Sequence, residues 1–299
     1  MEKYCLIGLG TITKRYLKGI SESGICLWAV SDIDENAVSR EYYSKYPFYS
    51  DYKEMISLEH PDGVIISTPP KTHFEIASYC IENNVNVIIE KPVTLCIKEF
   101  DTICKKAEEK GLYFKTLFHW QGGIETRAFA EEYDINLISK IKVNVCDPYS
   151  NDGETINPDR RCLCGAWIDS GVNILSMIKM WLPFEKTEII STKTQECKES
   201  GLPIYVSVNL MIDGVEAEIT VDWTKHRDQK ESFVTVGDKT VYINHSAQSI
   251  TDGQNTTEYG RMERLDEHYY SQFCSINKIE NTEQSRQIHK LLLEVNEVL

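Results

Sequence analysis

The sequence predicts an α/β chain in two parts. Residues 1–120 form a parallel sheet covered by helices, and residues 121–299 form an α+β domain with a large open, mostly antiparallel sheet. In the first part, short apolar runs alternate with longer stretches of helical periodicity, which is typical of a sheet buried on both faces. In the second part, strands follow one another through hairpin turns, which favours antiparallel pairing.

The first part is expected to alternate strictly between strands and helices. Pro69 and Pro70 follow the third strand and end it, because proline supplies no backbone donor to a ladder. The expected strands cover residues 3–7, 25–31, 63–67, 85–89 and 113–118. The expected helices cover residues 12–22, 35–43, 73–83 and 97–110.

The second part is expected to be rich in strands. Asp213-Gly214 and Gly237-Asp238 read as hairpin turns, where glycine supplies a positive φ. Gly122-Gly123 is expected to belong to the joint between the two parts. The expected strands cover residues 139–146, 188–195, 203–212, 215–222, 232–236 and 240–243. Helices are expected at residues 125–133, 169–181, 261–277 and 283–298.

The composition indicates a soluble globular protein, with 41% hydrophobic and 26% charged residues among 299. The net charge of −14 disfavours nucleic acid and anionic membranes as partners. The sequence has no apolar run near the roughly 20 residues of a membrane span and no signal-peptide pattern, so a cytoplasmic protein is expected. Cys162 and Cys164 are too close in sequence for a zinc knuckle, and no metal is expected.

A phosphate-binding turn is predicted after the first strand. Gly8 and Gly10, followed by Thr11 and Ile12, open a helix directly after that strand, as in a dinucleotide fingerprint. Gly8 permits a tight turn, Gly10 lets the backbone approach a pyrophosphate, and the helix N-terminus offers free N–H groups. Thr13 stands where the fingerprint has its third glycine, so helix and strand are expected to pack less closely. An ordinary glycine-rich turn is the alternative.

Asp32 supports the dinucleotide interpretation. It ends the second strand, about 22 residues after Gly10, where an acidic residue commonly bonds the adenosine ribose hydroxyls. A carboxylate there repels the extra phosphate of NADP, so NAD is the expected cofactor and NADP the alternative. Capping of the next helix is the other role open to Asp32. Together these features predict a Rossmann dinucleotide-binding domain over residues 1–120.

Two further motifs end strands at the same edge of the predicted sheet. Thr68-Pro69-Pro70, with His73, follows one strand, and Glu90-Lys91-Pro92 follows the next. Ligands of open α/β sheets bind outside the carboxyl ends of the strands. Lys91 is therefore a candidate site residue, although most lysines are exposed loop residues.

The series Gly8-x-Gly10, Thr68-Pro69-Pro70-x-x-His73-x-x-x-Ala77 and Glu90-Lys91-Pro92 resembles the glucose–fructose oxidoreductase/inositol dehydrogenase/rhizopine catabolism (Gfo/Idh/MocA) family over nearly the whole chain. The resemblance implies a Rossmann domain, an open-sheet substrate domain and NAD(P)-dependent redox chemistry on sugars or polyols. It implies that Lys91 reaches the substrate hydroxyl and the cofactor, and that its peptide bond to proline is often cis. The residues accordingly expected at the cofactor are Thr68, Pro69, His73, Glu90 and Lys91.

The family's second catalytic motif, Asp-x-Gly followed by a histidine, corresponds to Asp169-Ser170-Gly171-Val172-Asn173. Asn173 stands in place of the histidine. Asparagine can orient a hydroxyl but cannot take a proton at neutral pH, so proton removal falls to Asp169 or Lys91. The four-residue spacing places Asp169 and Asn173 on one helix face. Helix capping is the alternative role of Asp169.

Within the family, Asp-x-Gly-x-Asn followed by Leu175 and Ser176 resembles the aldose 1-dehydrogenases that act on galactose or L-arabinose. Those enzymes oxidise the anomeric carbon of a pyranose to a lactone. Phe118-His119-Trp120 lies where that group has an aromatic–histidine pair, but the serine and arginine that usually follow are absent. His119 is expected either to line the substrate site or to make a structural hydrogen bond. Four aromatic residues are candidates for stacking on a sugar: Trp167, Trp223, Tyr269 and Tyr270.

The sequence thus predicts an NAD(P)-dependent sugar oxidoreductase. Lys91 would bond the reacting hydroxyl, Asp169 would accept its proton, and Asn173 would hold a neighbouring hydroxyl of the sugar. One alternative is a reaction at a ring hydroxyl of a keto-sugar, an amino-sugar or a cyclitol, and another is a non-catalytic NAD-binding sugar sensor. The resemblance also implies a homo-oligomer that pairs through the open sheet.

Overall fold

The computed structural model describes residues 2–275 and 281–299 of the chain. By internal contacts the chain divides into two units, Met1–Phe118 with Tyr269–Arg286 and His119–His268 with Gln287–Leu299. The sequence places the domain boundary close to Phe118, but it assigns residues 269–286 to the second domain. The helices α7 (Arg264–Cys274) and α8 (Thr282–Asn296) contribute residues to both units.

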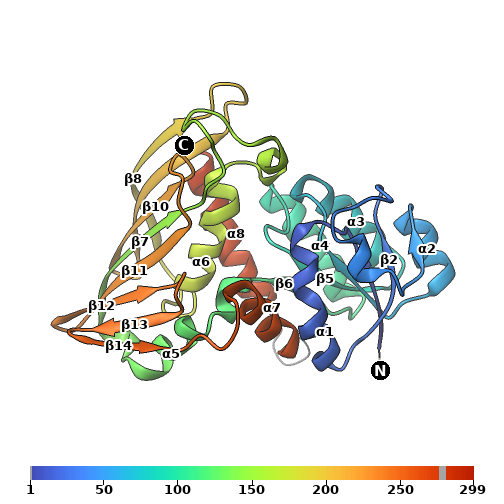
Figure 1. Ribbon diagram of the computed structural model, residues 1–299, viewed down its shortest axis with the longest axis horizontal. Coiled ribbons are helices and arrows are strands. Elements are labelled where there is room, and N and C mark those ends of the chain that lie inside the picture. Colours follow the sequence, from blue (N-terminus) through green and yellow to red (C-terminus); the bar gives the residue numbers. More distant parts are fainter. Residues whose placement is uncertain (1, 276–280) are drawn as a thin grey trace. The chain divides into compact units, whose positions relative to one another are not determined.

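The first unit contains a six-stranded sheet in the order β3-β2-β1-β4-β5-β6, in which every pairing is parallel (Figure 1). This is the strand order of a Rossmann fold, and it confirms the predicted fold class. The strands are β1 (Lys3–Ile7), β2 (Cys26–Ser31), β3 (Phe48–Tyr49), β4 (Gly63–Ile66), β5 (Asn86–Glu90) and β6 (Phe114–Leu117). The helices are η1 (Thr11–Arg15), α1 (Tyr16–Ser23), η2 (Arg40–Tyr43), α2 (Tyr52–Glu59), α3 (Pro70–Glu82) and α4 (Ile97–Glu109).

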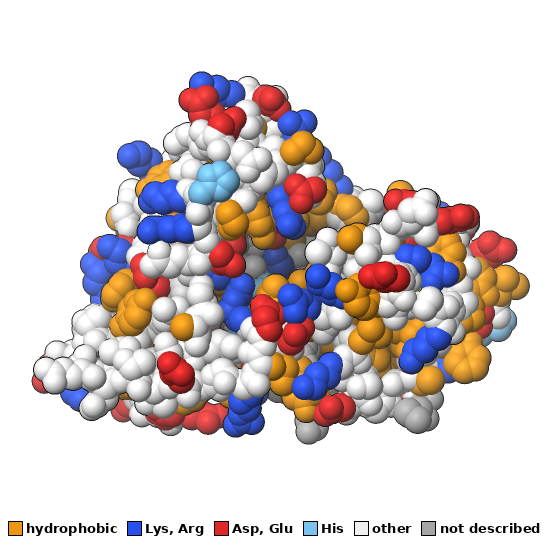
Figure 2. Space-filling view, in the orientation of Figure 1, with side chains coloured by type: hydrophobic (Ala, Val, Ile, Leu, Met, Phe, Trp, Pro, Cys, Tyr) orange, Lys and Arg blue, Asp and Glu red, His pale blue; other side chains and the backbone are white. Residues whose placement is uncertain are grey.

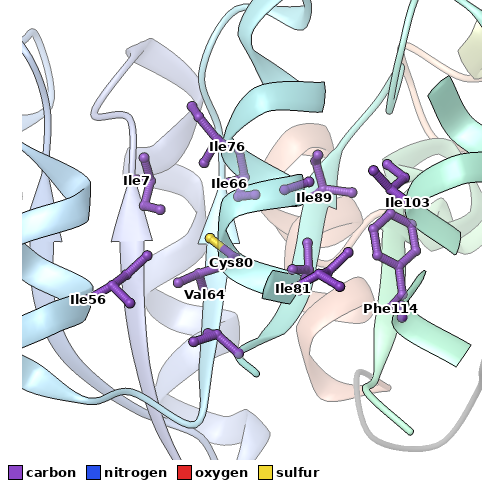
Figure 3. Close-up of a cluster of buried hydrophobic side chains, with 14 of the residues drawn as sticks. Ile7, Ile56, Val64, Ile66, Ile76, Cys80, Ile81, Ile89, Ile103 and Phe114 are labelled. Carbon is purple, nitrogen blue, oxygen red and sulfur yellow. The ribbon is translucent and has the colours of Figure 1, made fainter. Parts of the chain in front are cut away.

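One face of this sheet packs against the helices α2, α3 and α4. Successive side chains of a strand point to opposite faces, so alternate residues of β1, β4 and β5 enter the same core. Ile7, Ile66 and Ile89 lie there with Cys80 of α3 and Ile103 of α4 (Figure 3). All five are buried, which fixes the register of the strands against these helices.

The opposite face packs against α1 and the part of α7 that belongs to this unit. Leu6, Ile65 and Ile88, each a direct neighbour of a residue in the first core, are buried with Tyr16 of α1 and Phe273 of α7. Their burial confirms that the sheet is covered on both faces. It also explains why residues 269–286 group with the first unit, which the strand and helix pattern alone does not indicate.

Three details of this unit differ from the sequence prediction, the first being the short strand β3, which was not expected. The helix expected at residues 35–43 is wrong, because only the short 3-10 helix η2 forms there. Asp32 and Asp34 accept hydrogen bonds from the backbone N–H groups of Asp34 and Asn36, and such local turns compete with helix formation. Helix α2 was not expected, although Asp51 caps it by accepting a 2.8 Å bond from the Lys53 N–H.

The second unit contains an eight-stranded sheet in the order β14-β13-β12-β11-β7-β10-β9-β8 (Figure 1). Only the pairing of β7 with β10 is parallel, which confirms the expected mostly antiparallel sheet. The strands are β7 (Ile138–Cys146), β8 (Thr187–Glu196), β9 (Pro203–Ile212), β10 (Val215–Asp222), β11 (Gln229–Val236), β12 (Lys239–Asn244), β13 (Ser249–Asp252) and β14 (Asn255–Glu258). The helical segments are η3 (His119–Gly122), α5 (Ile124–Glu132), η4 (Ile135–Leu137), η5 (Pro158–Leu163), the π-helix η6 (Trp167–Gly171) and α6 (Val172–Ile178).

The sheet of the second unit has one covered and one open face. Along β9, buried residues alternate with half-buried ones at every step. Val206, Val208 and Leu210 point to the covered face. The open face carries ion pairs between Lys140 and the glutamates 216 and 218. On the face that Figure 2 draws, basic and acidic side chains are interspersed rather than gathered by sign.

No helix within residues 2–275 and 281–299 is both long and apolar enough to cross a bilayer.

The expected helix at residues 261–277 forms as α7, but its last two residues lie outside the described part of the chain.

Candidate functional site

The glycine turn after β1 has the geometry that a dinucleotide requires. Gly8 has a φ of 93°, and a Cβ at this position would lie 2.6 Å from the carbonyl oxygen of Ser67. Only glycine fits there, because both the backbone conformation and the contact exclude a side chain. A Cβ at Gly10 would meet no atom within 4 Å, so the approach to the Gly10 backbone is clear. The turn therefore fits a bound pyrophosphate.

The helix that follows the turn begins with 3-10 geometry at Thr11 and becomes α-helical at Tyr16. Its N-cap is Gly10, which has no side chain to cap the first N–H groups. Thr13, in the place of the third glycine, is buried and donates a 2.9 Å hydrogen bond to the Gly10 carbonyl. The threonine therefore closes the turn through its hydroxyl group.

Asp32 lies beside the glycine turn at the end of β2. Its Oδ2 accepts a 2.6 Å hydrogen bond from the Leu9 N–H, and its Oδ1 accepts a 2.9 Å bond from the Asp34 N–H. No α-helix follows within the next residues, so helix capping is not its role. Each carboxylate oxygen has a second lone pair, which could accept from a ribose hydroxyl.

Ser39 also shapes the turn and was missed by the sequence analysis. Its hydroxyl donates a 2.8 Å hydrogen bond to the Gly10 carbonyl, and its N–H donates to the Leu9 carbonyl at 3.1 Å. Only the irregular course of residues 34–39 brings Ser39 there. A helical reading of this segment hides the contact.

Glu90, the first residue of the glutamate–lysine–proline motif, is a buried carboxylate with three donors. Its Oε1 accepts 2.7 Å hydrogen bonds from the hydroxyl groups of Tyr16 and Tyr269, and its Oε2 accepts from the Lys91 N–H at 3.1 Å. The Tyr16 hydroxyl also lies 3.0 Å from the Ser67 hydroxyl. Burial raises the pKa of Glu90, while Lys91 and the two tyrosine bonds act in the opposite direction.

His73 holds the two strand-end motifs of this unit together. Its Nε2 lies 2.8 Å from the Thr68 carbonyl oxygen, and its Nδ1 lies 2.8 Å from the Pro92 carbonyl oxygen. Burial lowers the pKa of His73, although both carbonyl contacts oppose that shift. The structure therefore places His73 behind the cofactor motifs as a brace, with Thr68 and Pro69 at the more accessible positions.

Lys91 is half-buried at the end of β5, and its peptide bond to Pro92 is cis, as the resemblance implies. The expected cofactor-site residues Gly8, Gly10, Asp32, Thr68 and Lys91 all follow the carboxyl ends of parallel strands. The structure thus brings these sequence motifs to one edge of one sheet.

In the second unit, Asp169 lies within a π-helix that leads directly into α6. Neither segment has a side-chain N-cap, so capping does not explain Asp169. The glycine of the motif is required by packing, because a Cβ at Gly171 would lie 2.7 Å from the Trp167 ring. Single π-helical turns within helices are frequent at functional sites.

Asn173 follows one turn later and is buried. Its Nδ2 donates a 3.1 Å hydrogen bond to the Asp169 carbonyl. Its Oδ1 is buried and has no hydrogen-bond partner within the described residues. The side chain therefore presents an unused acceptor, which a hydroxyl group of a ligand could satisfy.

A buried ion pair is hydrogen-bonded to Ser170, the residue next to Asp169. The Asp147 Oδ1 lies 2.8 Å from Lys230 Nζ, and its Oδ2 accepts a 3.0 Å hydrogen bond from the Ser170 hydroxyl. Both charged side chains are nearly inaccessible. Asp147 thus anchors the neighbour of Asp169 to β11, a role that its place in a long polar stretch does not reveal.

His119 begins η3 and is buried in a cluster of the second unit. Its Nδ1 lies 3.2 Å from Nδ1 of His268. Close by, His245 Nδ1 lies 2.9 Å from Glu125 Oε1, and the His245 ring packs at a tilt of 40° against the Trp120 ring. The sequence identified His119 but not its partners, which come from distant segments.

Three of the four aromatic candidates for sugar stacking are buried, and only Tyr270 is partly accessible. Trp167, Trp223 and Tyr269 are buried in their units as core residues, so they are not available to stack on a ligand. Tyr270 is half-buried, and its hydroxyl donates a 2.7 Å hydrogen bond to Glu22.

Within residues 2–275 and 281–299, no group of three or more histidine, cysteine, aspartate or glutamate side chains could hold a metal ion.

Comparison with known proteins places this geometry in a family. Residues 3–118 match the model of the oxidoreductase family with an NAD-binding Rossmann fold. The chain is 26% identical over 145 residues to myo-inositol 2-dehydrogenase of Thermotoga maritima, covering 47% of this chain and 43% of that protein. It is 40% identical over 55 residues to UDP-N-acetylglucosamine 3-dehydrogenase of Acidithiobacillus ferrooxidans, covering 18% of each. The aligned segments thus span less than half the length of these curated relatives.

Solved structures show the same fold over almost the whole chain. A dehydrogenase (MviM) from Clostridium difficile matches with a TM-score of 0.81 at 16% identity, covering 100% of this chain and 99% of that one. GenD2 from gentamicin A biosynthesis, solved in complex with NAD, matches with a TM-score of 0.81 at 15% identity, covering 97% and 92%. With the glycine turn and the glutamate–lysine–proline motif at one sheet edge, these findings show that residues 3–118 are an NAD-binding Rossmann domain of the Gfo/Idh/MocA oxidoreductase family.

Proposed function

We propose that the protein is an NAD(P)-dependent oxidoreductase acting on a hydroxyl group of a sugar, a cyclitol or an amino-sugar. The observation that carries this proposal is the turn formed by Gly8, Gly10 and Asp32, which lies at the same edge of the sheet as Lys91. The nicotinamide, when bound, exchanges a hydride with the substrate carbon. The chain itself must then bind the substrate, orient its hydroxyl and handle one proton.

Lys91 is proposed to donate a hydrogen bond to the reacting oxygen. Its half-buried ammonium group would stabilise the negative charge that develops as the hydroxyl loses its proton. Glu90 holds the Lys91 N–H through its Oε2, which limits the freedom of the backbone at this position. Asp169 is proposed to accept the proton, since Asn173 cannot.

Asn173 and His119 are proposed to bind the substrate. The Asn173 Oδ1 lacks a partner within the described residues, so a substrate hydroxyl would satisfy a buried acceptor. His119 is proposed to line the same substrate. These roles explain why an asparagine can replace the family histidine without removing the ability to hold a polyol.

NAD is the proposed preferred cofactor. The Asp32 carboxylate lies at the turn, where it can accept hydrogen bonds from ribose hydroxyls and repel an added phosphate. NADP remains the alternative cofactor.

We propose oxidation of the anomeric carbon of a pyranose aldose to a lactone as the specific reaction. An anomeric hydroxyl is more acidic than an ordinary sugar alcohol, so Asp169 with Lys91 suffices as a weak base. The second candidate is reaction at a ring hydroxyl. The names of two relatives favour it, because one is a myo-inositol 2-dehydrogenase and the other a UDP-N-acetylglucosamine 3-dehydrogenase.

Cofactor absorbance over a panel of aldoses, cyclitols and nucleotide amino-sugars tests these proposals together. A lactone as first product supports the anomeric reaction, and a keto-sugar with its anomeric centre intact supports the second candidate. A stable NAD-binding protein that is inert to the whole panel contradicts the enzyme and leaves the non-catalytic sugar sensor.

We also propose that copies of the chain pair through the open face of the eight-stranded sheet. That face carries alternating half-buried side chains and the ion pairs of Lys140, which suit a polar interface. Sedimentation of the protein and of a Lys140→Glu variant tests this. A monomer in the wild type contradicts the proposal, and so does an assembly that the variant leaves unchanged.

A further inference from the structure

A cluster of three histidines and one glutamate lies buried in the second unit. His119, His245, His268 and Glu125 are each at most 7% exposed. They come from η3, the end of β12, α7 and α5, so only the folded chain brings them together. Of these residues, only His119 has a role in the proposed reaction.

The proton on one side of the cluster is fixed by Glu125. Its Oε1 lies 2.9 Å from His245 Nδ1, and a carboxylate can only accept, so His245 carries a proton on Nδ1. Although burial favours the neutral acid, the hydrogen bond and the electrostatic interaction with the His245 ring hold the pKa of Glu125 below its usual value. Glu125 is therefore an anion at neutral pH.

The second nitrogen of His268 lies near that carboxylate. A Cβ at Gly123 would lie 2.8 Å from Glu125 Oε1 and 3.1 Å from His268 Nε2, so both atoms border the same small space. Within the described residues, neither His268 Nε2 nor Glu125 Oε2 has a hydrogen-bond partner. Burial lowers the pKa of His268 to about 3, so its ring is neutral and carries a single proton.

We infer that Glu125 and His268 are positioning residues that fix the tautomer of His119. In this arrangement His268 holds its proton on Nε2, toward Glu125, and its Nδ1 accepts the Nδ1 proton of His119. The Nε2 of His119 then carries a lone pair. This inference rests on the proposed function, under which the lone pair would accept a hydrogen bond from a substrate hydroxyl.

The opposite tautomer is disfavoured by charge. It would place the lone pair of His268 Nε2 beside the Glu125 carboxylate, where two acceptors repel each other. The other charged or titratable groups around His268 are Arg264, Arg127 and His245, all of which disfavour a second proton on its ring. Each of them thus keeps the ring neutral and leaves the choice of tautomer to Glu125.

The consequence is a preference for the chemical nature of the substrate group. An acceptor at His119 Nε2 binds a hydroxyl, which can donate, but not a carbonyl oxygen at the same position. A ligand with a carbonyl group at that position, or with no hydroxyl group there, leaves the buried acceptor without a hydrogen bond. The cluster thus favours substrates with a hydroxyl group at this position. Only His119 would contact the substrate, and Glu125 and His268 would act through it.

Nitrogen NMR of the 15N-histidine-labelled protein tests the tautomer without any substrate. The seven histidines are assigned by single substitutions. We expect His119 to be protonated at Nδ1 and unprotonated at Nε2 at neutral pH. Protonation at Nε2 would overturn the inference.

The Glu125→Gln variant provides the decisive comparison. Its amide can still accept from His245 and also offers an N–H to His268, so the tautomers of His268 and His119 are expected to reverse. An unchanged His119 spectrum in the folded variant contradicts the inference. If Glu125→Gln does not fold, His268→Gln, which replaces the relaying ring, is examined in the same way and must change the His119 signals.

Kinetics with a sugar that turns over supply the second readout. Glu125→Gln is expected to raise KM roughly tenfold with a smaller change in kcat, because a ground-state hydrogen bond is lost. His226→Gln, at an exposed histidine of the same unit, should leave both constants unchanged. A changed kcat with unchanged KM would contradict the binding role. If no sugar is oxidised, the proposed function fails while the NMR result still decides the tautomer.

Discussion

The Tyr269 hydroxyl donates a 2.7 Å hydrogen bond to the buried Glu90 carboxylate, although 179 residues separate them in the chain. Tyr16 donates a second bond of the same length to the same oxygen. These contacts connect α1, which follows the glycine turn, and α7 to Glu90, the residue that precedes Lys91. A change in any of the three residues should therefore affect the whole motif.

Tyr269→Phe is expected to lower the free energy of unfolding by about 1.5–3 kcal/mol, the range for hydrogen bonds to charged groups. Burial raises the pKa of Glu90, so the folded state holds the Glu90 proton more tightly than the unfolded state does. The stability that this proton binding contributes is present at low pH and is lost as pH rises through the folded-state pKa. The tyrosine bond stabilises the ionised form. Denaturant unfolding should therefore show a larger loss at high pH than at low pH.

Tyr270→Phe is the matched control in the same helix, because its hydroxyl bonds Glu22 in an exposed position. It should cost little at any pH. A loss in Tyr269→Phe that does not vary with pH would contradict the ionised state of Glu90.

Gly8→Ala and Gly10→Ala should separate folding from cofactor binding. At Gly8 a methyl group clashes with the Ser67 carbonyl and the φ is positive, so the melting temperature should fall. At Gly10 the φ is −65° and a methyl group meets no protein atom within 4 Å, so the fold should be kept. Calorimetric titration should nevertheless show NAD binding weakened about tenfold or more in Gly10→Ala. Normal NAD binding by that variant would remove the pyrophosphate from this turn.

The sequence predicts much of the first unit because its signals are local. Gly8, Asp32 and the long apolar strands need only their neighbours to be interpreted, whereas the two-residue strand β3 was not expected. The helix expected at residues 35–43 fails because the turns at Asp32 and Asp34 compete with it. Ser39, which the expectation leaves in a helix, instead bonds the glycine turn.

The partners of the site residues could not be predicted, because they depend on tertiary packing. Tyr269 reads equally well as a sugar-stacking residue, and only the fold buries it against Glu90. Likewise, Glu125 and His268 lie far apart in the sequence, and Gly123 carries no signal that it separates them. Long-range contacts of this kind leave no periodicity in a single sequence.

Asp32→Ala should narrow the preference for NAD over NADP. The lost hydrogen bonds to ribose are expected to cost NAD about 1.5–3 kcal/mol, whereas NADP gains from the removal of the repulsion. The ratio of kcat/KM for the two cofactors measures this. Asp32→Asn is the control, because it keeps an acceptor for the Leu9 N–H without the charge. A wild-type enzyme equally efficient with NADP would contradict the role of Asp32.

Lys91→Met keeps the length of the side chain and removes its charge. If Lys91 stabilises the developing negative charge, turnover should fall roughly 10²-fold while NAD still binds. Steady-state kinetics and NAD titration check the two parts separately. Lys71→Met, at an exposed lysine of α3, should behave as the wild type, and near-normal turnover in Lys91→Met would make Lys91 an ordinary loop residue.

The proposed role of Asp169 is to accept the proton in an NAD(P)-dependent oxidation of a sugar or polyol hydroxyl. It is tested most directly by following NAD(P) reduction in the wild type and in Asp169→Asn over the panel of aldoses, cyclitols and nucleotide amino-sugars. We expect the wild type to reduce the cofactor with at least one class, and Asp169→Asn to lose most turnover while keeping the wild-type melting temperature and NAD affinity. A wild type that is inert to the whole panel, or an Asp169→Asn variant with normal turnover, would contradict the account.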